Sequence, residues 1–372
     1  MNQENLKHRY IVIMAGGKGE RFWPVSRQAT PKQLITLLGN RSFLQQAVDR
    51  VLPLAPVENI FVITNEIQAR TVQRQLPNLP KSNIIGEPCG RDTCAAVALG
   101  TALVAARDPE GVMAVLPADH VIPDEEKFQQ ILSDSLDLAS QQDIFVTIGI
   151  KPSEPATGYG YIQTGPALDP APAGLKTTFF QSRRFVEKPN HEKAVEYLAS
   201  GEYRWNAGMF IWSCRSILAG LQAHRPEMAE ACERWRLAAV RRTLKKTLAR
   251  EYPAITKISI DFALMEHATN VVVADGSFIW DDLGAWTALA RHLTPDAHGN
   301  CAVADLIQVD ATGNIVFDAR TKRRTPIGLV GVHDTIVVLT DDAVLVADIK
   351  LAQKIKDLVG KLAAQEKYQH LV

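Results

Sequence analysis

Short apolar runs alternate with longer segments of helical periodicity from Tyr10 to Ile150, and this alternation constrains the fold more than any other feature of the chain. Such a rhythm predicts βαβ units, in which a helix connects two parallel strands. The strand runs are continuously apolar, which is typical of a sheet covered by helices on both faces. The expected strands are residues 10–14, 60–64, 83–85, 112–116 and 144–150, and the expected helices are 42–54, 93–107 and 128–140. We therefore predict an α/β fold with a mostly parallel sheet, whose ligands bind beyond the carboxyl ends of the strands.

The rest of the chain indicates a second, smaller domain. The middle third is irregular and rich in Pro and Gly, and we expect it to be an insertion that builds the far wall of a cleft. From about Asp296, short β-rich runs follow one another between turn residues, and a helix-like pattern at 349–365 closes the chain. Because 372 residues exceed the size at which one core usually stops growing, two domains are expected. They are 1–295 and a β-rich domain at 296–372 that ends in a helix.

Charge and cysteine content narrow the class of ligand. Lys plus Arg and Asp plus Glu each number 41, without runs of like charge. We therefore expect no nucleic-acid partner and no membrane surface, and a small polar or anionic ligand fits better. The five cysteines lack C-x-x-C spacing, which argues against a disulfide framework or a zinc site. No stretch approaches the roughly 20 apolar residues of a membrane span, and we expect a protein of the reducing cytoplasm.

A glycine-rich loop directly follows the first expected strand. Gly16, Gly17 and Gly19 permit positive φ, so backbone N–H groups could approach an anion closely. A dinucleotide fingerprint would require glycine at Phe22, and a P-loop would require Ser or Thr after its lysine, where this chain has Gly19. Taken alone, these glycines favour a simple tight turn over a phosphate cradle. The arginine and lysine that follow, at 21 and 32, are cations suited to phosphate oxygens.

The segment "AGGKGERFWPVSRQATPKQL" at 15–34 resembles the signature of sugar-nucleotide pyrophosphorylases, in the version found in mannose-1-phosphate guanylyltransferases. Further motifs follow in the same order as in that family. They are "GEPCGRDTCAAVAL" at 86–99, "LPADH" at 116–120, "TGYGYI" at 157–162, "FVEKP" at 185–189, "WNAGMF" at 205–210, "SIDFALME" at 259–266 and "WDDLGAW" at 280–286. The chain departs from the family pattern at Asp92, which replaces Asn, at Cys94 and Ala95, which replace Ala-Pro, and at Asp281, an additional carboxylate.

The resemblance implies a nucleotidyltransferase domain at 1–295 with a Rossmann-like, GT-A-like fold, and GTP and mannose-1-phosphate as substrates. A phosphate oxygen of the sugar phosphate attacks the α-phosphorus of GTP, pyrophosphate leaves in line, and GDP-mannose is formed. The enzyme must position two anions that repel each other and must neutralise charge at the reacting phosphorus. No nucleophilic side chain is required.

The resemblance also implies a Mg²⁺ site at Asp119 and Asp282, because hard oxygen ligands from two distant segments suit this ion. Each of these carboxylates could instead cap a neighbouring helix. Asp281 could be a third ligand, but we expect it to be a helix N-cap.

Phosphate, nucleotide and sugar roles follow from the matching motifs. We expect Arg21 to hold the leaving pyrophosphate, Lys32 to contact the α-phosphate and Lys188 to bind the sugar phosphate. Glu87 is the candidate guanine reader, because a carboxylate can accept the N1–H and exocyclic amine hydrogens of guanine, but it could equally end a strand at the surface. The full nucleotide set is Ala15, Gly16, Gly17, Gly19, Glu87, Arg91 and Thr93, and the sugar-phosphate set is Gly158, Tyr159, Gly160, Glu187, Lys188 and Asn206. Tyr159 and Trp205 could equally be ordinary wall residues.

Other functions remain open at the level of sequence. The substrate could be another manno-configured sugar phosphate, such as a heptose phosphate, or several sugars and bases. The chain could also be a nucleotide-sugar sensor without activity, although such decay usually removes a carboxylate or a phosphate-binding cation. A dehydrogenase is disfavoured, because the dinucleotide fingerprint fails at Phe22. The β-rich tail is interpreted as a packing or dimerisation element, and a homodimer is expected.

Overall fold

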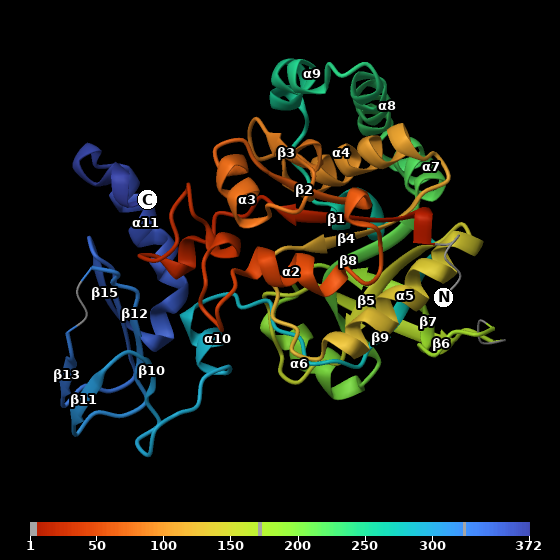
Figure 1. Ribbon diagram of the computed structural model, residues 1–372. Helices are drawn as coiled ribbons and strands as arrows, with labels where there is room; N and C mark the ends of the chain where they lie inside the picture. The colour runs from red at the N-terminus through yellow and green to blue at the C-terminus, as the bar shows by residue number, and fades with distance from the viewer. Residues whose placement is uncertain (1–5, 170–172, 323–324) are drawn as a thin grey trace. The chain divides into compact units, whose positions relative to one another are not determined.

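The computed structural model of this protein describes residues 6–169, 173–322 and 325–372 (Figure 1). Contacts between Cα atoms divide the chain into two compact units. The first unit contains Met1–Gly16, Ala47–Ala118 and Ile122–Trp280, and the second contains Gly17–Gln46, Asp119–Val121 and Asp281–Val372. Each unit therefore combines segments that lie far apart in the sequence.

A nine-stranded mixed sheet forms the centre of the first unit, in the order β3-β2-β1-β4-β8-β5-β9-β7-β6. The strands are β1 (Arg9–Ala15), β2 (Ile60–Asn65), β3 (Ile84–Glu87), β4 (Val112–Pro117), β5 (Phe145–Ile150), β6 (Tyr161–Ala167), β7 (Phe179–Val186), β8 (Tyr203–Ser213) and β9 (Val271–Gly276). The predicted parallel arrangement is confirmed for β1 to β4, and β5 is parallel to β9. The remaining pairs are antiparallel, because β8 runs between β4 and β5 in the opposite direction and β7 pairs antiparallel with β9.

Helices cover both faces of this sheet. On β1, Arg9 donates hydrogen bonds to Ser133 and Asp137 of α5 (Glu125–Gln141). A Cβ on Gly100 of α4 (Asp92–Arg107) would lie 2.8 Å from Val12, so α4 packs directly on the same strand. Because residues 9 and 12 of a strand point to opposite faces, α4 and α5 lie on opposite sides of the sheet, as the continuous apolar strands predicted.

Other helices of the first unit are α3 (Ala69–Gln75), α6 (His191–Ser200), α7 (Cys214–His224), α8 (Pro226–Val240), α9 (Leu244–Glu251) and a π-helix at Asp261–Met265. The π-helix lies within the "SIDFALME" motif, and Ala263, Leu264 and Met265 are buried in the core. π-Helical turns are uncommon and frequently occur at functional sites.

The C-terminal part of the second unit contains two small sheets between which the chain alternates. One has the order β10 (Cys301–Val303), β12 (Ile315–Asp318), β14 (Thr335–Leu339) and β15 (Val344–Asp348). The other pairs β11 (Leu306–Val309) with β13 (Ile327–Val330) in parallel. Among the described strands of these two sheets, β14 and β15 form the one antiparallel pair. The β-rich character expected after residue 296 is confirmed. The predicted terminal helix is α11 (Ile355–Ala363), preceded and followed by 3₁₀ turns at Ile349–Lys354 and Glu366–Leu371.

The segment that follows the glycine-rich loop packs into the core of this second unit. The Trp286 ring of α10 (Trp286–Ala290) lies 5.1 Å from the Phe22 ring and 5.2 Å from the Phe317 ring, measured between centroids. The Trp23 indole N–H donates to the Leu371 carbonyl at 2.8 Å. The contacts thus group Gly17–Gln46 and residues from Asp281 onward with the C-terminal strands. The boundary at 295/296 stays a prediction.

Within the described residues, no helix has both the length and the apolar character needed to cross a bilayer. All five cysteines carry free thiols, and four of them are buried.

Candidate active site

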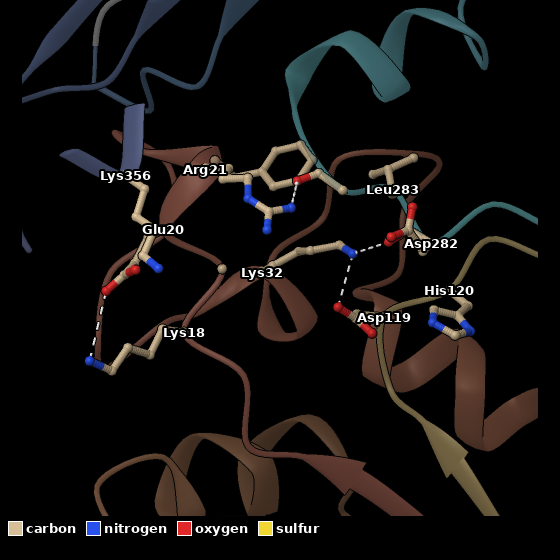
Figure 2. Close-up of a pocket in the computed structure, with 12 residues that line it drawn as sticks. Lys18, Glu20, Arg21, Lys32, Asp119, His120, Asp282, Leu283 and Lys356 are labelled. Carbon is tan, nitrogen blue, oxygen red and sulfur yellow. Dashed lines mark hydrogen bonds and ion pairs between the residues drawn. The ribbon is translucent and has the colours of Figure 1, made fainter. Parts of the chain in front are cut away.

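A cavity of about 310 Å³ opens beside the glycine-rich loop of the second unit (Figure 2). Its lining is polar and charged, and it unites four segments that are distant in the sequence. The lining residues are Lys18, Gly19, Glu20, Arg21, Phe22, Lys32, Asp119, His120, Asp282, Leu283, Gly284 and Lys356. The structure therefore brings together the predicted Arg21, Lys32, Asp119 and Asp282.

Lys32 occupies a fixed position in this cavity. It opens a 3₁₀ turn at Lys32–Leu34, and its ammonium lies 2.9 Å from Oδ2 of Asp119 and 2.5 Å from the main-chain oxygen of Asp282. The side chain is buried, and the ammonium also lies 5.9 Å from the centre of the Phe22 ring. These two hydrogen bonds hold the positively charged ammonium of Lys32 between Asp119 and Asp282.

The electrostatics of Asp119 follow from that pairing. Burial alone would raise the pKa of its carboxyl group, but the positive charge of Lys32, the nearby His120 and hydrogen bonds outweigh burial and lower the pKa. Asp119 is therefore a carboxylate at neutral pH.

A short antiparallel bridge explains how Asp119 and Asp282 meet. The Val121 N–H donates to the Asp281 oxygen at 2.9 Å, and the Asp281 N–H donates to the Val121 oxygen at 3.1 Å. This bridge joins the segment after β4 to the segment after Trp280. Asp119 is not a helix cap, because the N-cap of α5 is Asp124.

Asp281 does not have the role expected from the sequence. The N-cap of α10 is Ala285, so the predicted cap at Asp281 is wrong. Its buried carboxylate instead accepts two hydrogen bonds from Arg291 at 2.9 Å and one from the Leu283 N–H at 2.8 Å. Burial would raise the pKa of Asp281, but these donors and His292 lower it. The structure thus uses Asp281 to hold the turn that presents Asp282.

Gly19 is required for a different reason from the one that its motif suggests. It has φ of +62°, and a Cβ there would lie only 2.5 Å from the Cβ of Lys32. Gly16 and Gly17 do not have positive φ. The loop therefore packs directly on the backbone of Lys32, and Gly19 permits both the turn and this approach. Arg21 follows in the turn at Glu20–Phe22 and donates to the Gly284 oxygen at 2.9 Å.

A polar cluster in the first unit contains the predicted sugar-site residues. Asn206 lies in β8, and its side-chain amide donates to Oδ1 of Asp261 at 2.9 Å. The amide oxygen of Asn206 accepts from the Thr147 hydroxyl and from the Gly208 N–H. A β-bulge between Thr147 and Gly149 accompanies this arrangement. Asn206 is consequently held in one orientation.

Glu187 and Lys188 follow β7 directly. The Lys188 ammonium lies 2.5 Å from Oε1 of Glu187, and Lys188 has φ of +45°, which is uncommon for a residue with a side chain. Gly160 packs against Glu187, because a Cβ on Gly160 would lie 2.5 Å from Oε2. The Asn206 N–H donates to the Gly160 oxygen at 2.8 Å. The structure thus brings together four of the predicted sugar-site residues, from three motifs.

Gly158 and Tyr159 complete the set. A Cβ on Gly158 would meet no atom within 4 Å. The Tyr159 ring lies 4.9 Å from Trp205 and 5.3 Å from Trp280 between centroids, so it is part of an aromatic cluster.

Sequence reasoning missed Asp261. Burial and the negative charge of Glu187 raise the pKa of its carboxyl group to about 6, while hydrogen bonds oppose this shift. The signal was present, because Asp261 lies within the "SIDFALME" motif, but nothing in the sequence places it beside Asn206. Lys18 and Lys356 were also missed as cavity residues. Lys18 lies within the glycine-rich motif and could have been found there, whereas Lys356 lies outside every quoted motif.

Glu87 ends β3 and is buried. The Tyr252 hydroxyl donates a hydrogen bond to Oε1 of Glu87, and a Cβ on Gly16 would lie 3.1 Å from Oε2. Burial raises the pKa of Glu87 to about 7, although the Tyr252 hydrogen bond acts in the opposite direction. Among the candidate residues, Glu87 is therefore a carboxyl group whose charge changes near neutral pH.

The remaining nucleotide candidates make structural contacts in the first unit. The Ala15 oxygen accepts from Thr64 at 3.0 Å, and the Thr93 hydroxyl accepts from the Ile260 N–H at 2.8 Å. The Arg91 guanidinium donates to the Pro253 oxygen. Asp92, the departure from Asn, has φ of +66°, a region in which Asn and Asp are both enriched. The backbone thus explains why this replacement is tolerated.

Comparison with known proteins identifies the relatives of this chain. Residues 10–297 match the nucleotidyl transferase family, and residues 304–362 match the MannoseP isomerase/GMP-like β-helix domain. A mannose-1-phosphate guanylyltransferase of Escherichia coli (strain K12) is 38% identical over 369 residues, which are 98% of this chain and 75% of that protein. One from Salmonella montevideo is 39% identical over 363 residues, which are 97% of this chain and 75% of that protein.

A solved structure agrees with these relatives. The crystal structure of a protein described as mannose-1-phosphate geranyltransferase, from Thermus thermophilus, has a TM-score of 0.82 and 32% identity. The similarity covers 95% of this chain and 99% of that chain.

These matches and the fold define the class, and the chain belongs to the nucleotidyl transferase family. Within that family it belongs with the mannose-1-phosphate guanylyltransferases, as its opening motif indicated. Nucleotidyltransferases of this kind generally use a divalent metal ion.

The residues of the cavity fit such an ion. Asp119 and Asp282 contribute hard carboxylate oxygens to one polar cavity, and two protein ligands leave positions for phosphate oxygens and water. In the described parts of the chain, no group of three or more His, Cys, Asp or Glu side chains is arranged to hold a metal by itself.

Proposed function

We propose that this protein transfers the guanylyl group of GTP to mannose-1-phosphate. A phosphate oxygen of the sugar phosphate forms a bond to the α-phosphorus, the bond from that phosphorus to the α–β bridging oxygen breaks, and pyrophosphate leaves with the bonding electrons. The products are GDP-mannose and pyrophosphate. The observation that carries the proposal is the cavity in which Lys32 is fixed between Asp119 and Asp282.

We assign the reacting phosphates to this cavity. Lys32 would contact the α-phosphate, because its ammonium is already oriented and therefore requires no reorganisation as charge develops. Arg21 would bind the leaving pyrophosphate, since its guanidinium lines the same cavity and matches phosphate oxygens geometrically. Asp119 and Asp282 would hold Mg²⁺, which supplies charge neutralisation at the phosphates when bound.

We assign the sugar phosphate to the polar cluster of the first unit. Lys188 would bind the phosphate of mannose-1-phosphate, and its exposed ammonium is held by Glu187. Glu187 and Asn206 would bind sugar hydroxyls, with the backbone at Gly158–Gly160 close to the sugar. Tyr159 would provide an apolar wall. Asp261 would act as a positioning residue through Asn206.

We assign the base to Glu87. A carboxylate there would accept hydrogen bonds from the adjacent N1–H and exocyclic amine of guanine, a pair that adenine, whose N1 is an acceptor, cannot supply. The predicted backbone contacts at Ala15, Gly16, Gly17 and Gly19 would lie along the nucleotide. Arg91 and Thr93 also stay candidates for nucleotide binding. Their side chains already form hydrogen bonds within the protein, Arg91 with the Pro253 oxygen and Thr93 with the Ile260 N–H.

Pyrophosphate release from purified protein tests this function. Mannose-1-phosphate and Mg²⁺ are combined with GTP, ATP, CTP, UTP or dTTP in separate reactions. We expect release with GTP, and strong preference for another nucleotide would contradict the Glu87 assignment. If no nucleotide supports release, other sugar phosphates such as a heptose phosphate are tested, and complete failure would favour a sensor.

The Lys188 assignment has its own variant. Lys188→Asn removes the cation but suits the left-handed backbone, so the loop should keep its conformation. We expect the KM for mannose-1-phosphate to rise by about tenfold, with the KM for GTP nearly unchanged. A change confined to GTP would move Lys188 to the other substrate. The expected homodimer is checked separately by sedimentation velocity.

A further inference from the structure

Lys356 contributes a positive charge to the cavity from the C-terminal helix. It is the second residue of α11, is exposed, and lines the same space as Arg21 and Lys32. No sequence motif singled it out, and no role in catalysis is otherwise assigned to α11. Figure 2 shows its side chain descending toward Glu20 and the loop.

Packing of α11 explains why Lys356 is held there. Ile355 and Val359 are one turn apart and both buried, so this face of the helix anchors it in the core that also contains Phe22 and Trp23. Lys356 follows Ile355 directly and is thereby placed at the edge of the cavity. Its Cα position depends on the core of the second unit rather than on a loose terminal segment.

The other cations of the cavity already have partners. Lys32 is paired with Asp119, Lys18 lies 3.7 Å from Glu20, and Arg21 donates to the Gly284 oxygen. Among the residues that the structure describes, the ammonium of Lys356 has no hydrogen bond or ion pair. It is therefore a cation available to a ligand at no cost of breaking an internal pair.

The cavity has two ends of different character. Figure 2 shows Asp119 and Asp282 at one end, Lys18, Glu20 and Lys356 at the other, and Arg21 and Lys32 between them. If the α-phosphate lies at Lys32 and the two aspartates, the rest of a triphosphate can extend past Arg21 toward Lys356. A triphosphate tail carries several negative charges. At this end of the cavity Lys18 is paired with Glu20, and Lys356 adds a positive charge that can bind the tail.

We propose that Lys356 binds the β- and γ-phosphates of the nucleotide and the pyrophosphate product. The C-terminal domain thereby contributes directly to phosphate binding, beyond packing or dimerisation. This inference deepens the proposed function and rests on it for the identity of the nucleotide, but the predicted ligand, inorganic pyrophosphate, can be tested without turnover.

The first measurement is calorimetric titration of the full chain with inorganic pyrophosphate in the presence of Mg²⁺. We expect Lys356→Ala to weaken binding by about three- to tenfold, since an exposed charge-assisted contact to phosphate is lost. Lys356→Arg should retain most of the affinity, and Lys356→Glu should weaken it further. Lys361→Ala is the matched control, because Lys361 lies on the same helix, is exposed and does not line the cavity.

Steady-state kinetics in both directions provide the second measurement. Lys356→Ala should raise the KM for GTP in synthesis and for pyrophosphate in the reverse reaction by a similar factor, while the KM for mannose-1-phosphate stays unchanged. Unchanged pyrophosphate affinity and unchanged KM values in a folded Lys356→Ala variant would overturn the proposal, as would an effect confined to mannose-1-phosphate.

The two proposals fail in different ways. If the wild-type chain binds pyrophosphate through Lys356 but shows no turnover with GTP and any sugar phosphate, the proposed function fails and the Lys356 site stands. If turnover is normal but insensitive to Lys356, the function stands and the Lys356 site fails.

Discussion

The ammonium of Lys32 lies 2.9 Å from Oδ2 of Asp119, so a predicted phosphate-binding cation and a predicted metal ligand form one ion pair. Lys32 is nearly inaccessible to solvent, with only 6% of its side chain exposed, whereas 35% of the Asp119 side chain is exposed. Burial therefore fixes the Lys32 side chain, while the Asp119 carboxylate stays accessible from the cavity. The same contact lowers the pKa of Asp119 against the effect of burial.

Lys32→Met should separate the structural and chemical parts of this pair. The variant leaves Asp119 without its ammonium partner, and we expect a loss of about 1–3 kcal/mol in the free energy of unfolding, measured by urea denaturation. The kcat should fall by about 100-fold or more because the oriented charge is lost. Adding Asp119→Asn should restore much of the stability but none of the activity. Restored activity in the double variant would show that neither group acts at the phosphates.

Neighbouring aspartates should give opposite phenotypes. Asp282→Asn should reduce Mg²⁺-dependent turnover by about 100-fold or more with an unchanged melting temperature, because its carboxylate is proposed to hold the ion. Asp281→Asn should instead lower stability by about 1–3 kcal/mol, since its carboxylate accepts hydrogen bonds from Arg291 and the Leu283 N–H. Thermal unfolding and Mg²⁺ titration distinguish the two. The assignment is reversed if Asp281→Asn is the folded, metal-deficient variant.

Glu87 should make both stability and base recognition depend on pH. Burial raises its folded-state pKa from 4.5 to about 7, so the folded protein binds a proton more tightly than the unfolded chain. The stabilisation from this proton is complete below pH 4.5 and is lost as pH rises toward 7, by on the order of 2–3 kcal/mol. Glu87→Gln should lack this decline, as measured by denaturation at several pH values.

The same group predicts a kinetic effect. In the proposed role, the charged form of Glu87 would accept both guanine hydrogens, so the KM for GTP should rise as pH falls below about 7. Glu87→Gln should remove this dependence and reduce the preference for GTP over ATP. An unchanged preference in a folded variant would exclude Glu87 as the base reader.

Asp261 should act on the sugar through Asn206. Asp261→Ala removes the acceptor that holds the Asn206 amide, and we expect the KM for mannose-1-phosphate to rise by about three- to tenfold. Asp261→Asn keeps an oxygen acceptor at that position and should retain most of the affinity. Because the pKa of Asp261 is raised to about 6, the stability that its proton contributes is lost between about pH 4 and 6, and Asp261→Asn should also flatten that part of the stability profile. Equal KM values for both variants would argue against positioning through this hydrogen bond.

The sequence by itself determined the parallel part of the sheet and the identity of the family. Continuous apolar runs such as β1 and β4 must be covered on both faces, and the motifs from Gly16 to Asp282 keep their family order. These features can be predicted from sequence because each depends on residues that lie close together in the chain: the apolar pattern of a strand, the position of a glycine and the spacing within a motif. The resemblance proposed roles for Lys32, Asp119 and Asp282, and these roles stay predictions. The structure adds that all three residues line one cavity, which no contact visible in the sequence shows.

Only the tertiary structure decided which partner each side chain has. Asp282 lines the cavity, whereas the adjacent Asp281 pairs with Val121 through its backbone and binds Arg291 through its carboxylate, a role that the sequence pattern did not predict. Asp261 meets Asn206 because a π-helix and a bulged strand pack together, and Lys356 reaches the cavity because Ile355 and Val359 anchor α11. Such contacts depend on long-range packing, in which the energy of a residue is set by neighbours that the linear order of the chain does not specify.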